Sequence, residues 1–498
     1  MFDQILNGFV HCFMPLNMFM IAFGLIGGMI IGALPGFTAT MGVAVLVPLT
    51  YWVPPEVGLN LLSAIFCGSI YGGSITAILL RIPGTPASVP TSFDGFALTQ
   101  QGQPERALGV STFSSAMGGF LSALALMFFS PILALAALKF GPPELMALAI
   151  FGLSVVSILS PGRLVKGLIA CIIGLLMGVV GQDPLHGFPR LTFGQYQLLG
   201  GFPLVPVLIG LFSIPPAIEM AEQLITRRQI EGVFGSLLLS MQDFKRCWWT
   251  TIRSSLIGIG IGIIPAAGPD IASFVAYNDE VRRSKHPERF GKGAIEGVAA
   301  PEAANNGCTG GSLIPLLTLG IPGSPPAAIF LGALFIHGLR PGPMIFDTRP
   351  EVGFTVIAGF IVINILMYFV GLGFCRLAKH VVRVPQNILA PVIVVLTVVG
   401  SYAISTNMFD VWVMLISGLV GYGMQRTGFP LSPICLALIL GPMLESEMIR
   451  TNLMFHGNYF LFYTRPIAAL LLVLSLVMFC WPWIARWMAK WRSEKVNA

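Results

Sequence analysis

Charged side chains are scarce in this chain of 498 residues, because Asp, Glu, Lys and Arg together make up only 10% of it. Soluble proteins carry about 25% charged residues. No hydrophilic run is long enough for a soluble domain, and the longest polar stretches are 219–253 and 279–302. Hydrophobic residues make up 55% of the chain, and its mean hydropathy is +0.83. This composition cannot cover a water-facing surface, so we predict that lipid is the main solvent.

Several catalytic and energy-coupling motifs are missing from the sequence. It contains no GxxxxGK[S/T] motif, which argues against transport driven by a bound nucleotide. It has no HExxH, no clustered Cys/His set and no GxSxG, which argues against the enzymes that use them. The eight cysteines are scattered without a CxxC pair, as expected for small buried hydrophobes. We expect no enzymatic activity and no cofactor, and we expect an ion gradient, of Na⁺ or H⁺, to supply the energy.

Long apolar runs are abundant. A helix that spans a membrane needs roughly 20 mostly apolar residues. Five shorter runs, too short for full spans, are predicted as half-helices or re-entrant segments: 40–53, 202–218, 305–320, 326–339 and 430–443. The candidate spans are 16–34, 57–80, 107–130, 143–159, 164–181, 254–268, 352–375, 387–403, 409–424 and 465–485. The sequence therefore predicts an all-α polytopic membrane protein with about ten to fourteen spans.

One sequence pattern occurs twice. Residues 72–86 read GGSITAILLRIPGTP, and residues 310–325 read GGSLIPLLTLGIPGSP, with one residue inserted. A Gly/Pro pair precedes each copy, at 32–35 and at 262–265. Two related halves, each with an apolar segment interrupted by Gly and Pro, are the sequence signature of a secondary transporter.

The two patterns divide the chain. We predict a first membrane repeat at 1–218, an amphipathic charged connector at 219–253, a second repeat at 254–445, and a C-terminal membrane helix with a basic tail at 446–498. The tail is rich in Lys and Arg, which predicts a cytoplasmic C-terminus.

The orientation of the two repeats follows from their charged flanks. The apolar hairpin 254–277 has basic flanks on both sides, whereas its counterpart 16–53 has no Lys or Arg nearby until Arg81. This difference favours inverted repeats. Lys139, compared with the basic cluster that begins at Arg376, does not, and a parallel arrangement remains the alternative.

The segment 32–40, GALPGFTAT, has the composition of a broken helix. Pro35 frees a backbone carbonyl, which makes it a coupling-ion candidate. Gly36 allows unusual backbone angles, and Thr38 supplies a hydroxyl, so both are substrate-binding candidates. A broken membrane helix offers carbonyls to a cation and N–H groups to an anion. The alternative is a kink that only serves helix packing.

The two segments RIPGTP (81–86) and GIPGSP (320–325) force a helix to stop. At membrane depth such tips are tolerated only where they are packed in protein or line a cavity. Arg81 adjoins the first tip and suits a carboxylate. The alternatives are surface loops and an Arg that extends to the interface. The substrate-binding candidates here are Arg81, Gly84, Thr85, Ser88, Gly323 and Ser324.

Acid and amide side chains precede the second tip. Glu302, Asn305 and Asn306 stand between Pro301 and Gly307, and Asp270 follows Pro269. Amides coordinate Na⁺ or hold a carboxylate, and an intramembrane acid carries a proton or neutralises a cation. Helix capping and surface exposure are the alternatives. We take Asp270, Glu302, Asn305 and Asn306 as coupling-ion candidates, with Na⁺ and H⁺ both open.

The stretches 265–343, 32–50, 71–88 and 93–109 resemble the large membrane subunit of tripartite tricarboxylate transporters. The resemblance covers nearly the whole chain. It implies a permease of about twelve helices in the bacterial inner membrane, driven by a cation gradient. It also implies a small membrane subunit and a periplasmic solute-binding protein that delivers a carboxylate, such as citrate.

The motifs of that family fall here on Gly32, Pro35, Gly36, Gly84, Pro86, Glu302, Asn305, Asn306, Gly320, Pro322 and Gly323. Residues 265–270, PAAGPD, depart from the glycine-rich turn that the resemblance leads us to expect. A permease is therefore the predicted function. A passive channel for small anions is one alternative, since broken helices also line pores. A membrane-embedded enzyme is the other, although the acids at membrane depth are few and scattered.

Overall fold

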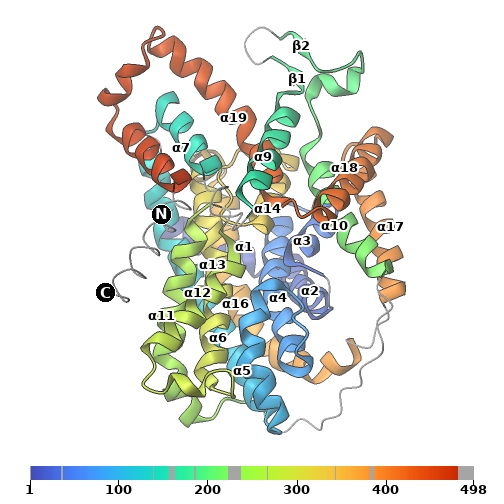
Figure 1. Ribbon diagram of the computed structural model, residues 1–498, viewed down its shortest axis with the longest axis vertical. Helices are drawn as coiled ribbons and strands as arrows, with labels where there is room; N and C mark the ends of the chain where they lie inside the picture. The colour runs from blue at the N-terminus through green and yellow to red at the C-terminus, as the bar shows by residue number, and fades with distance from the viewer. Residues whose placement is uncertain are drawn as a thin grey trace, which may run out of the picture.

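The computed structural model describes residues 2–34, 37–137, 139–154, 156, 163–183, 187–222, 237–265, 267–342, 344–381 and 386–480. Helices dominate these residues, and the strands are one two-residue pair (Figure 1). The helices of the first part are α1 (Phe2–Cys12), α2 (Pro15–Ala33), α3 (Ala39–Thr50), α4 (Pro55–Leu80), η1 (Pro86–Ser88), α5 (Val89–Gln100), α6 (Pro104–Ala137), α7 (Pro142–Ser154), α9 (Leu164–Val179), η2 (Tyr196–Gly200) and α10 (Leu204–Glu222). Those of the second part are α11 (Met241–Ile263), α12 (Gly268–Arg283), η3 (Pro287–Arg289), α13 (Ile295–Leu319), α14 (Pro325–Ile336), α15 (Met344–Thr348), α16 (Pro350–Val381), α17 (Gln386–Ser405), α18 (Met408–Arg426), α19 (Ser432–Met454) and η4 (Tyr459–Thr464).

Seven of the described helices are long and apolar enough to cross a membrane, which makes the chain an all-α polytopic membrane protein. They are α2, α4, α6, α10, α16, α18 and α19. Every residue in the most apolar stretch of α4 is buried inside the protein, so this helix lies at the centre of the bundle. Shorter apolar helices include α3, α7, α9, α14 and the segment Pro466–Cys480.

Three of the predicted short segments belong to longer helices instead. The run 305–320 belongs almost entirely to the 25-residue helix α13. The run 202–218 belongs to α10, and the run 430–443 belongs to α19, each long enough to span. These last two apolar runs end where charged residues begin, near Glu219 and Glu445. The helices continue because Glu, Met, Ala and Leu are good helix formers. The predicted short segments 40–53 and 326–339 are confirmed as the short helices α3 and α14.

The predicted connector 219–253 is divided between two helices. Its first residues end α10, and residues 241–253 form the first half of α11. Residues 223–236 lie outside the described part of the chain. In the C-terminal segment, residues 481–498 with the basic tail also lie outside it.

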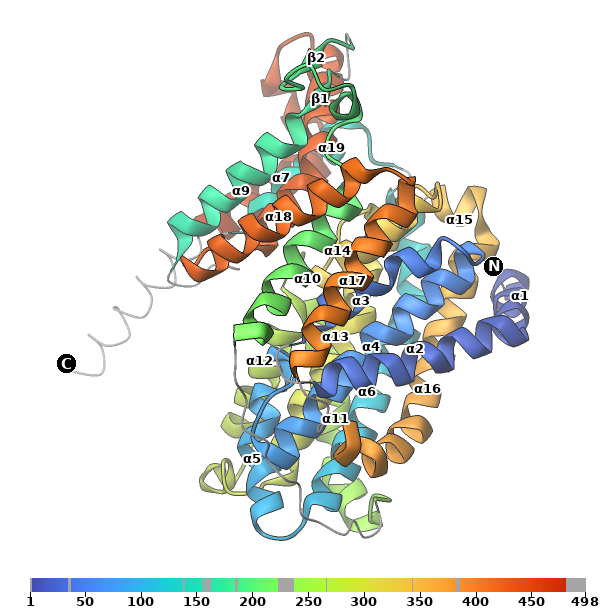
Figure 2. The same cartoon turned by 90° about the vertical axis from the view of Figure 1, so that its right-hand side faces the viewer.

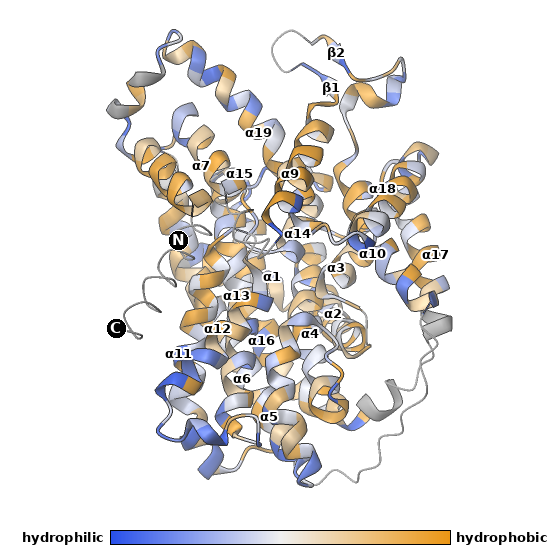
Figure 3. Ribbon diagram, in the orientation of Figure 1, coloured by the Kyte–Doolittle hydropathy of each residue, from blue (hydrophilic) through white to orange (hydrophobic). Residues whose placement is uncertain are grey.

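The polar residues gather at the two ends of the molecule (Figure 3). Hydrophilic residues gather at the lower ends of α5 and α11 in Figure 3, whereas the middle of the bundle is largely hydrophobic. At the opposite end, beside the outer end of α19, β1 (Gly181–Gln182) and β2 (Pro189–Arg190) pair antiparallel in a hairpin (Figures 1 and 2). Arg190 fixes this hairpin to α19 through a two-point bond to Glu445.

Candidate functional site

The two copies of the sequence pattern have the same backbone structure. α4 ends with Arg81 in the left-handed conformation (φ 57°), and α13 ends with Gly320 in that conformation (φ 74°). After each end the loop turns back along its own helix. The Gly84 N–H donates to the Gly73 carbonyl (3.1 Å), and the Gly323 N–H donates to the Ser312 carbonyl (3.2 Å). Each loop therefore reaches back to a residue seven positions before the end of its helix, about two helical turns.

Each copy packs closely on a helix that itself stops in mid-bundle. A Cβ at Gly84 would lie 1.9 Å from the Gly32 carbonyl oxygen, and one at Gly323 would lie 2.1 Å from that of Gly262. Gly32 lies at the end of α2, and Gly262 at the end of α11. Glycine is required at both tips because a carbonyl occupies the space of any side chain.

The direction of these helices follows from their glycine contacts. Along α2, Gly24, Gly28 and Gly32 meet α4 at residues 61, 65 and 69 in turn, so the two helices run in the same direction. α11 and α13 are related likewise, since Gly258 meets Ala304 and Gly262 meets Cys308. α3 runs back along α4, since Gly42 meets Ser69 whereas Thr50 meets Gly58, and α12 runs back along α11, since Arg253 pairs with Asp279 (3.0 Å). α2 with α3, and α11 with α12, are therefore two hairpins that enter the bundle and return.

The two copies are antiparallel where they meet. Ser74 of α4 donates to Glu302 of α13 (2.6 Å), and Cys67 lies 3.7 Å from the Thr309 hydroxyl. Cys67 lies seven residues before Ser74 on α4, whereas Thr309 lies seven residues after Glu302 on α13, so the two helices run in opposite directions. Beyond the tips, η1 packs against α12, and α14 packs against α3, so each tip contacts the hairpin of the other copy.

Glu302 lies at this crossing and is fully buried. Its Oε1 accepts hydrogen bonds from Ser74 (2.6 Å) and Thr91 (2.5 Å), and its Oε2 accepts from Ser115 (2.7 Å) and Ser111 (3.1 Å). No cation pairs with Glu302 among the described residues. A hydroxyl donates only one proton, so four donating hydroxyls match an ionised carboxylate, and a bound proton requires one hydroxyl to rotate.

Asn305 and Asn306 extend this polar cluster along α13. The Asn306 amide donates to the Asn305 oxygen (2.9 Å), and the Asn305 amide donates to Glu302 (3.4 Å). Both side chains are fully buried. The Asn306 Oδ1 has no hydrogen-bond partner in the described structure, so it is available to a cation or a water molecule.

The remaining predicted residues divide between the two tips. Thr85 is buried, and its Oγ1 has no hydrogen-bond partner within the described residues. Ser88 is buried and donates to the Thr85 carbonyl (2.7 Å). Arg81 is exposed and lies over the Phe96 ring at 6.0 Å. At the second tip the Ser324 hydroxyl bonds Ser312 (3.2 Å) and caps α14.

Asp270 and Thr38 occupy helix starts. Asp270 is exposed in the first turn of α12, and the nearby Gly268 N–H donates to the Gly323 carbonyl (3.3 Å). Thr38 caps α3 by accepting from the Met41 N–H (3.2 Å). Pro35 and Gly36 lie outside the described residues, between the end of α2 and this cap.

The sequence analysis missed the hydroxyl groups around Glu302. Ser74, Thr91, Ser111 and Ser115 come from α4, α5 and α6, far from Glu302 in the chain. One sequence signal could have indicated a shared polar contact: Ser111 and Ser115 lie one helical turn apart, on the same face of a helix, in an apolar segment. Their common target became visible only in three dimensions.

Comparison with known proteins now adds the family. Residues 18–436 match the family described as "Tripartite tricarboxylate transporter TctA family". The chain belongs to this family. The TctA family comprises the large subunit of these transporters, in agreement with the resemblance seen in the sequence motifs.

Two proteins of Agrobacterium vitis are similar to this TctA-family chain. One, the "Uncharacterized 52.8 kDa protein in TAR-I ttuC' 3'region", is 38% identical over 479 residues, which is 96% of this chain and 95% of that protein. The other, the "Uncharacterized protein in TAR-II ttuC' 3'region", is 41% identical over 217 residues, 44% of this chain and 90% of that protein. No solved structure matches this member of the TctA family.

Proposed function

We propose that this chain is the permease subunit of a binding-protein-dependent secondary transporter in the bacterial inner membrane. It imports a carboxylate, such as citrate or a related tri-, di- or monocarboxylate, and a Na⁺ or H⁺ gradient drives the import. The observation that carries this proposal is the pair of tips with matching backbone bonds, at Gly84 and Gly323, each packed on the other copy's hairpin.

The two copies are inverted repeats in this proposal. The tip bonds match residue for residue, and α4 and α13 cross antiparallel. Two equivalent helices that cross antiparallel along the membrane normal are related by a two-fold axis in the membrane plane. Inverted repeats of this kind place the substrate and ion sites near the bilayer midplane.

The first tip is the better place for the substrate carboxylate. Arg81 supplies an exposed guanidinium, and Thr85 offers a hydroxyl that has no partner in the described residues. At the second tip Gly320 replaces the cation, and the Ser324 hydroxyl is already bonded. A planar guanidinium matches the two oxygens of a carboxylate, so Arg81 orients the substrate.

The second copy supplies the groups for the coupling ion. Asp270 presents a carboxylate beside the second tip, and Glu302 lies at the crossing of α4 and α13. The amide oxygen of Asn306 has no hydrogen-bond partner among the described residues. Coupling requires only that the ion binds the loaded state more tightly than the empty state. Glu302 bonds to helices of the first copy, so a movement between the two copies changes the surroundings of Glu302 and, in this proposal, the affinity for the ion.

Two further subunits complete the transporter. A periplasmic solute-binding protein delivers the carboxylate, and a small membrane subunit packs beside this chain. The substrate then crosses by rocking or sliding of the part that carries the tips against the rest of the bundle.

Uptake into proteoliposomes tests the proposal. The vesicles contain this chain with its small subunit, and the purified binding protein and labelled carboxylates are outside. Accumulation that requires both the binding protein and an imposed Na⁺ or H⁺ gradient supports the proposal and names the ion. A leak that is independent of the gradient, with no accumulation of any ligand of the binding protein, overturns it in favour of a channel.

A further inference from the structure

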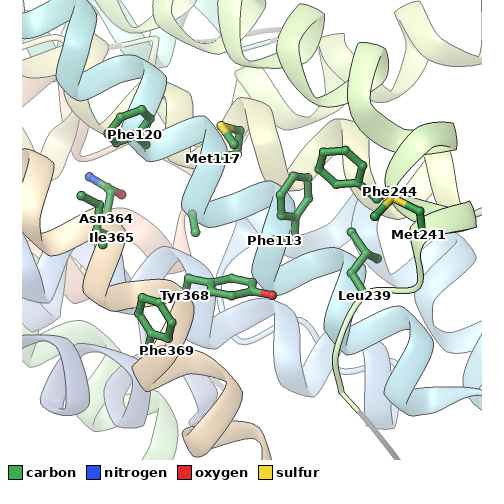
Figure 4. Close-up of a pocket in the computed structure, with 11 residues that line it drawn as sticks. Phe113, Met117, Phe120, Leu239, Met241, Phe244, Asn364, Ile365, Tyr368 and Phe369 are labelled. Carbon is green, nitrogen blue, oxygen red and sulfur yellow. The ribbon is translucent and has the colours of Figure 1, made fainter.

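An apolar groove runs along the outside of the bundle, and none of the residues that line it belongs to the tips. It is lined by α6, α16 and the start of α11, and its volume is about 540 Å³ (Figure 4). Ten of its eleven lining residues are apolar or aromatic; Asn364 is fully buried. Its outer wall includes Ile365 and Phe369, 46% and 64% exposed, so the groove faces the surroundings of the bundle. α6 and α16 are candidate membrane spans, so the medium outside the groove is lipid.

One end of the groove lies where three helix ends meet. α6 and α16 are antiparallel, since Gly119 meets Asn364 and Gly371 meets Thr112. The start of α6 therefore lies beside the end of α16. Arg106 of α6 binds Asp243 of α11 through two bonds (2.6 and 2.9 Å), which places the start of α11 at the same end.

Two unpaired cations stand at this end. Lys245 follows the lining residue Phe244, and Arg376 lies two turns beyond the lining residue Phe369 on the same face of α16. Both are exposed, and neither forms an ion pair within the part of the chain that the structure describes. By contrast, the neighbouring Arg106 and Arg246 are both paired with acids.

An interfacial aromatic residue accompanies these cations. Trp249 is 72% exposed one turn beyond Lys245, and the Trp248 ring contacts the ring of the lining residue Phe244 in a tilted arrangement, with the ring centroids 5.1 Å apart. Exposed Trp residues next to Lys and Arg mark the boundary between hydrocarbon and head groups. The groove thus begins in the hydrocarbon region and ends at the head-group level.

We propose that this groove binds an anionic phospholipid. One acyl chain lies along the apolar wall, and the phosphate lies between Lys245 and Arg376. Charge complementarity selects an anionic head group over a zwitterionic one, because each Lys or Arg near the surface attracts anionic lipid. A helix of a partner protein in the groove would leave these two cations without a counter-charge.

Native mass spectrometry of the detergent-solubilised full chain tests this proposal with phosphatidylglycerol and phosphatidylethanolamine as probes. We expect Lys245→Ala and Arg376→Ala each to lower the affinity for phosphatidylglycerol about fivefold, and phosphatidylethanolamine binding to change little. Lys285→Ala is the matched control, since Lys285 is exposed in the loop after α12, and it should change neither lipid.

A second variant tests the acyl chain. Met117→Trp adds bulk inside the groove and should reduce binding of both lipids, and its thermal unfolding midpoint reports whether it folds. Unchanged phosphatidylglycerol binding in Lys245→Ala and Arg376→Ala overturns the proposal, whatever Met117→Trp does. Equal binding of the two lipids in the wild-type chain also overturns it, because the cations then select nothing.

Discussion

Glu302 is surrounded by hydrogen-bond donors rather than by a cation. Ser74, Thr91, Ser111 and Ser115 direct their hydroxyls at its two oxygens. Hydroxyls can rotate and exchange donor for acceptor, so this shell accommodates both a charged and a neutral Glu302. Such a group is suited to bind and release a proton, or to neutralise a nearby cation, without a change of fold.

The substitution Glu302→Gln removes the charge and keeps the shape. We expect gradient-driven accumulation of substrate to fall about 5- to 150-fold, the usual range of a coupling free energy, while exchange of substrate across the membrane persists. Paired uptake and exchange assays in proteoliposomes measure the difference. Glu351→Gln, at an exposed acid in the first turn of α16, is the control. Unchanged accumulation in Glu302→Gln would remove the coupling role.

Arg81 combines backbone strain with an exposed charge. Its left-handed conformation costs roughly 1–2 kcal/mol for a residue other than glycine, and the equivalent residue in the second copy is Gly320. We expect Arg81→Gly to unfold at the same temperature as the wild type or higher, and to raise the KM for the carboxylate about 10- to 100-fold. Thermal unfolding and uptake kinetics check the two effects. A lower unfolding temperature with an unchanged KM would contradict the substrate role.

At this scale the sequence predicted particular residues but not their partners. Glu302 was singled out because an intramembrane acid can carry a proton or neutralise a cation, and Arg81 because it adjoins the first tip and suits a carboxylate. The hydroxyl shell of Glu302 was not predicted, since Ser and Thr are common in apolar helices and their contacts depend on packing. Asp270 and Asn306 were predicted as ion candidates, and their roles stay predictions.

At the scale of elements, glycine contacts fix how the broken helices meet. The tips at Gly84 and Gly323 rest on the carbonyls of Gly32 and Gly262, and the helices cross at backbone distance. Close contact of this kind, at small residues, is how membrane helices associate, since lipid supplies no hydrophobic driving force between them.

Alanine at the tips therefore tests the crossing. We expect Gly84→Ala and Gly323→Ala each to destabilise the chain by roughly 1–3 kcal/mol and to abolish uptake, because the new methyl group overlaps a carbonyl. Thermal unfolding in detergent measures the change. Gly27→Ala and Gly260→Ala are matched controls on α2 and α11, where the described structure has no atom within 4 Å of the new methyl group. These two should be neutral or more stable, and equal losses in all four variants would contradict the account.

The breaks in the helices were predictable because Pro and Gly dictate them, but the lengths of α10 and α19 were not. Charged residues such as Glu219 and Glu445 end an apolar run without ending the helix. The turning back of the loops at Gly84 and Gly323 was also invisible in the sequence. It depends on backbone bonds to residues eleven positions earlier.

At the scale of the whole molecule, the two hairpins enter from opposite ends. α2 runs parallel to α4, α11 runs parallel to α13, and α4 and α13 are antiparallel at their crossing. The loop after α3 and the loop after α12 thus lie at opposite ends of the bundle. The basic residues Arg282, Arg283 and Lys285 lie at and just after the end of α12, so the positive-inside rule predicts that this end faces the cytoplasm.

Cysteine labelling of these two loops tests the inverted arrangement most directly. Trp52→Cys lies after α3 and Lys285→Cys after α12, both at exposed positions, and seven of the eight native cysteines are buried. With a membrane-impermeant maleimide, we predict that intact cells label Trp52→Cys but not Lys285→Cys, and that permeabilised cells label both. Labelling of both variants in intact cells, or of neither, would place the two loops on one side of the membrane and contradict the inverted arrangement.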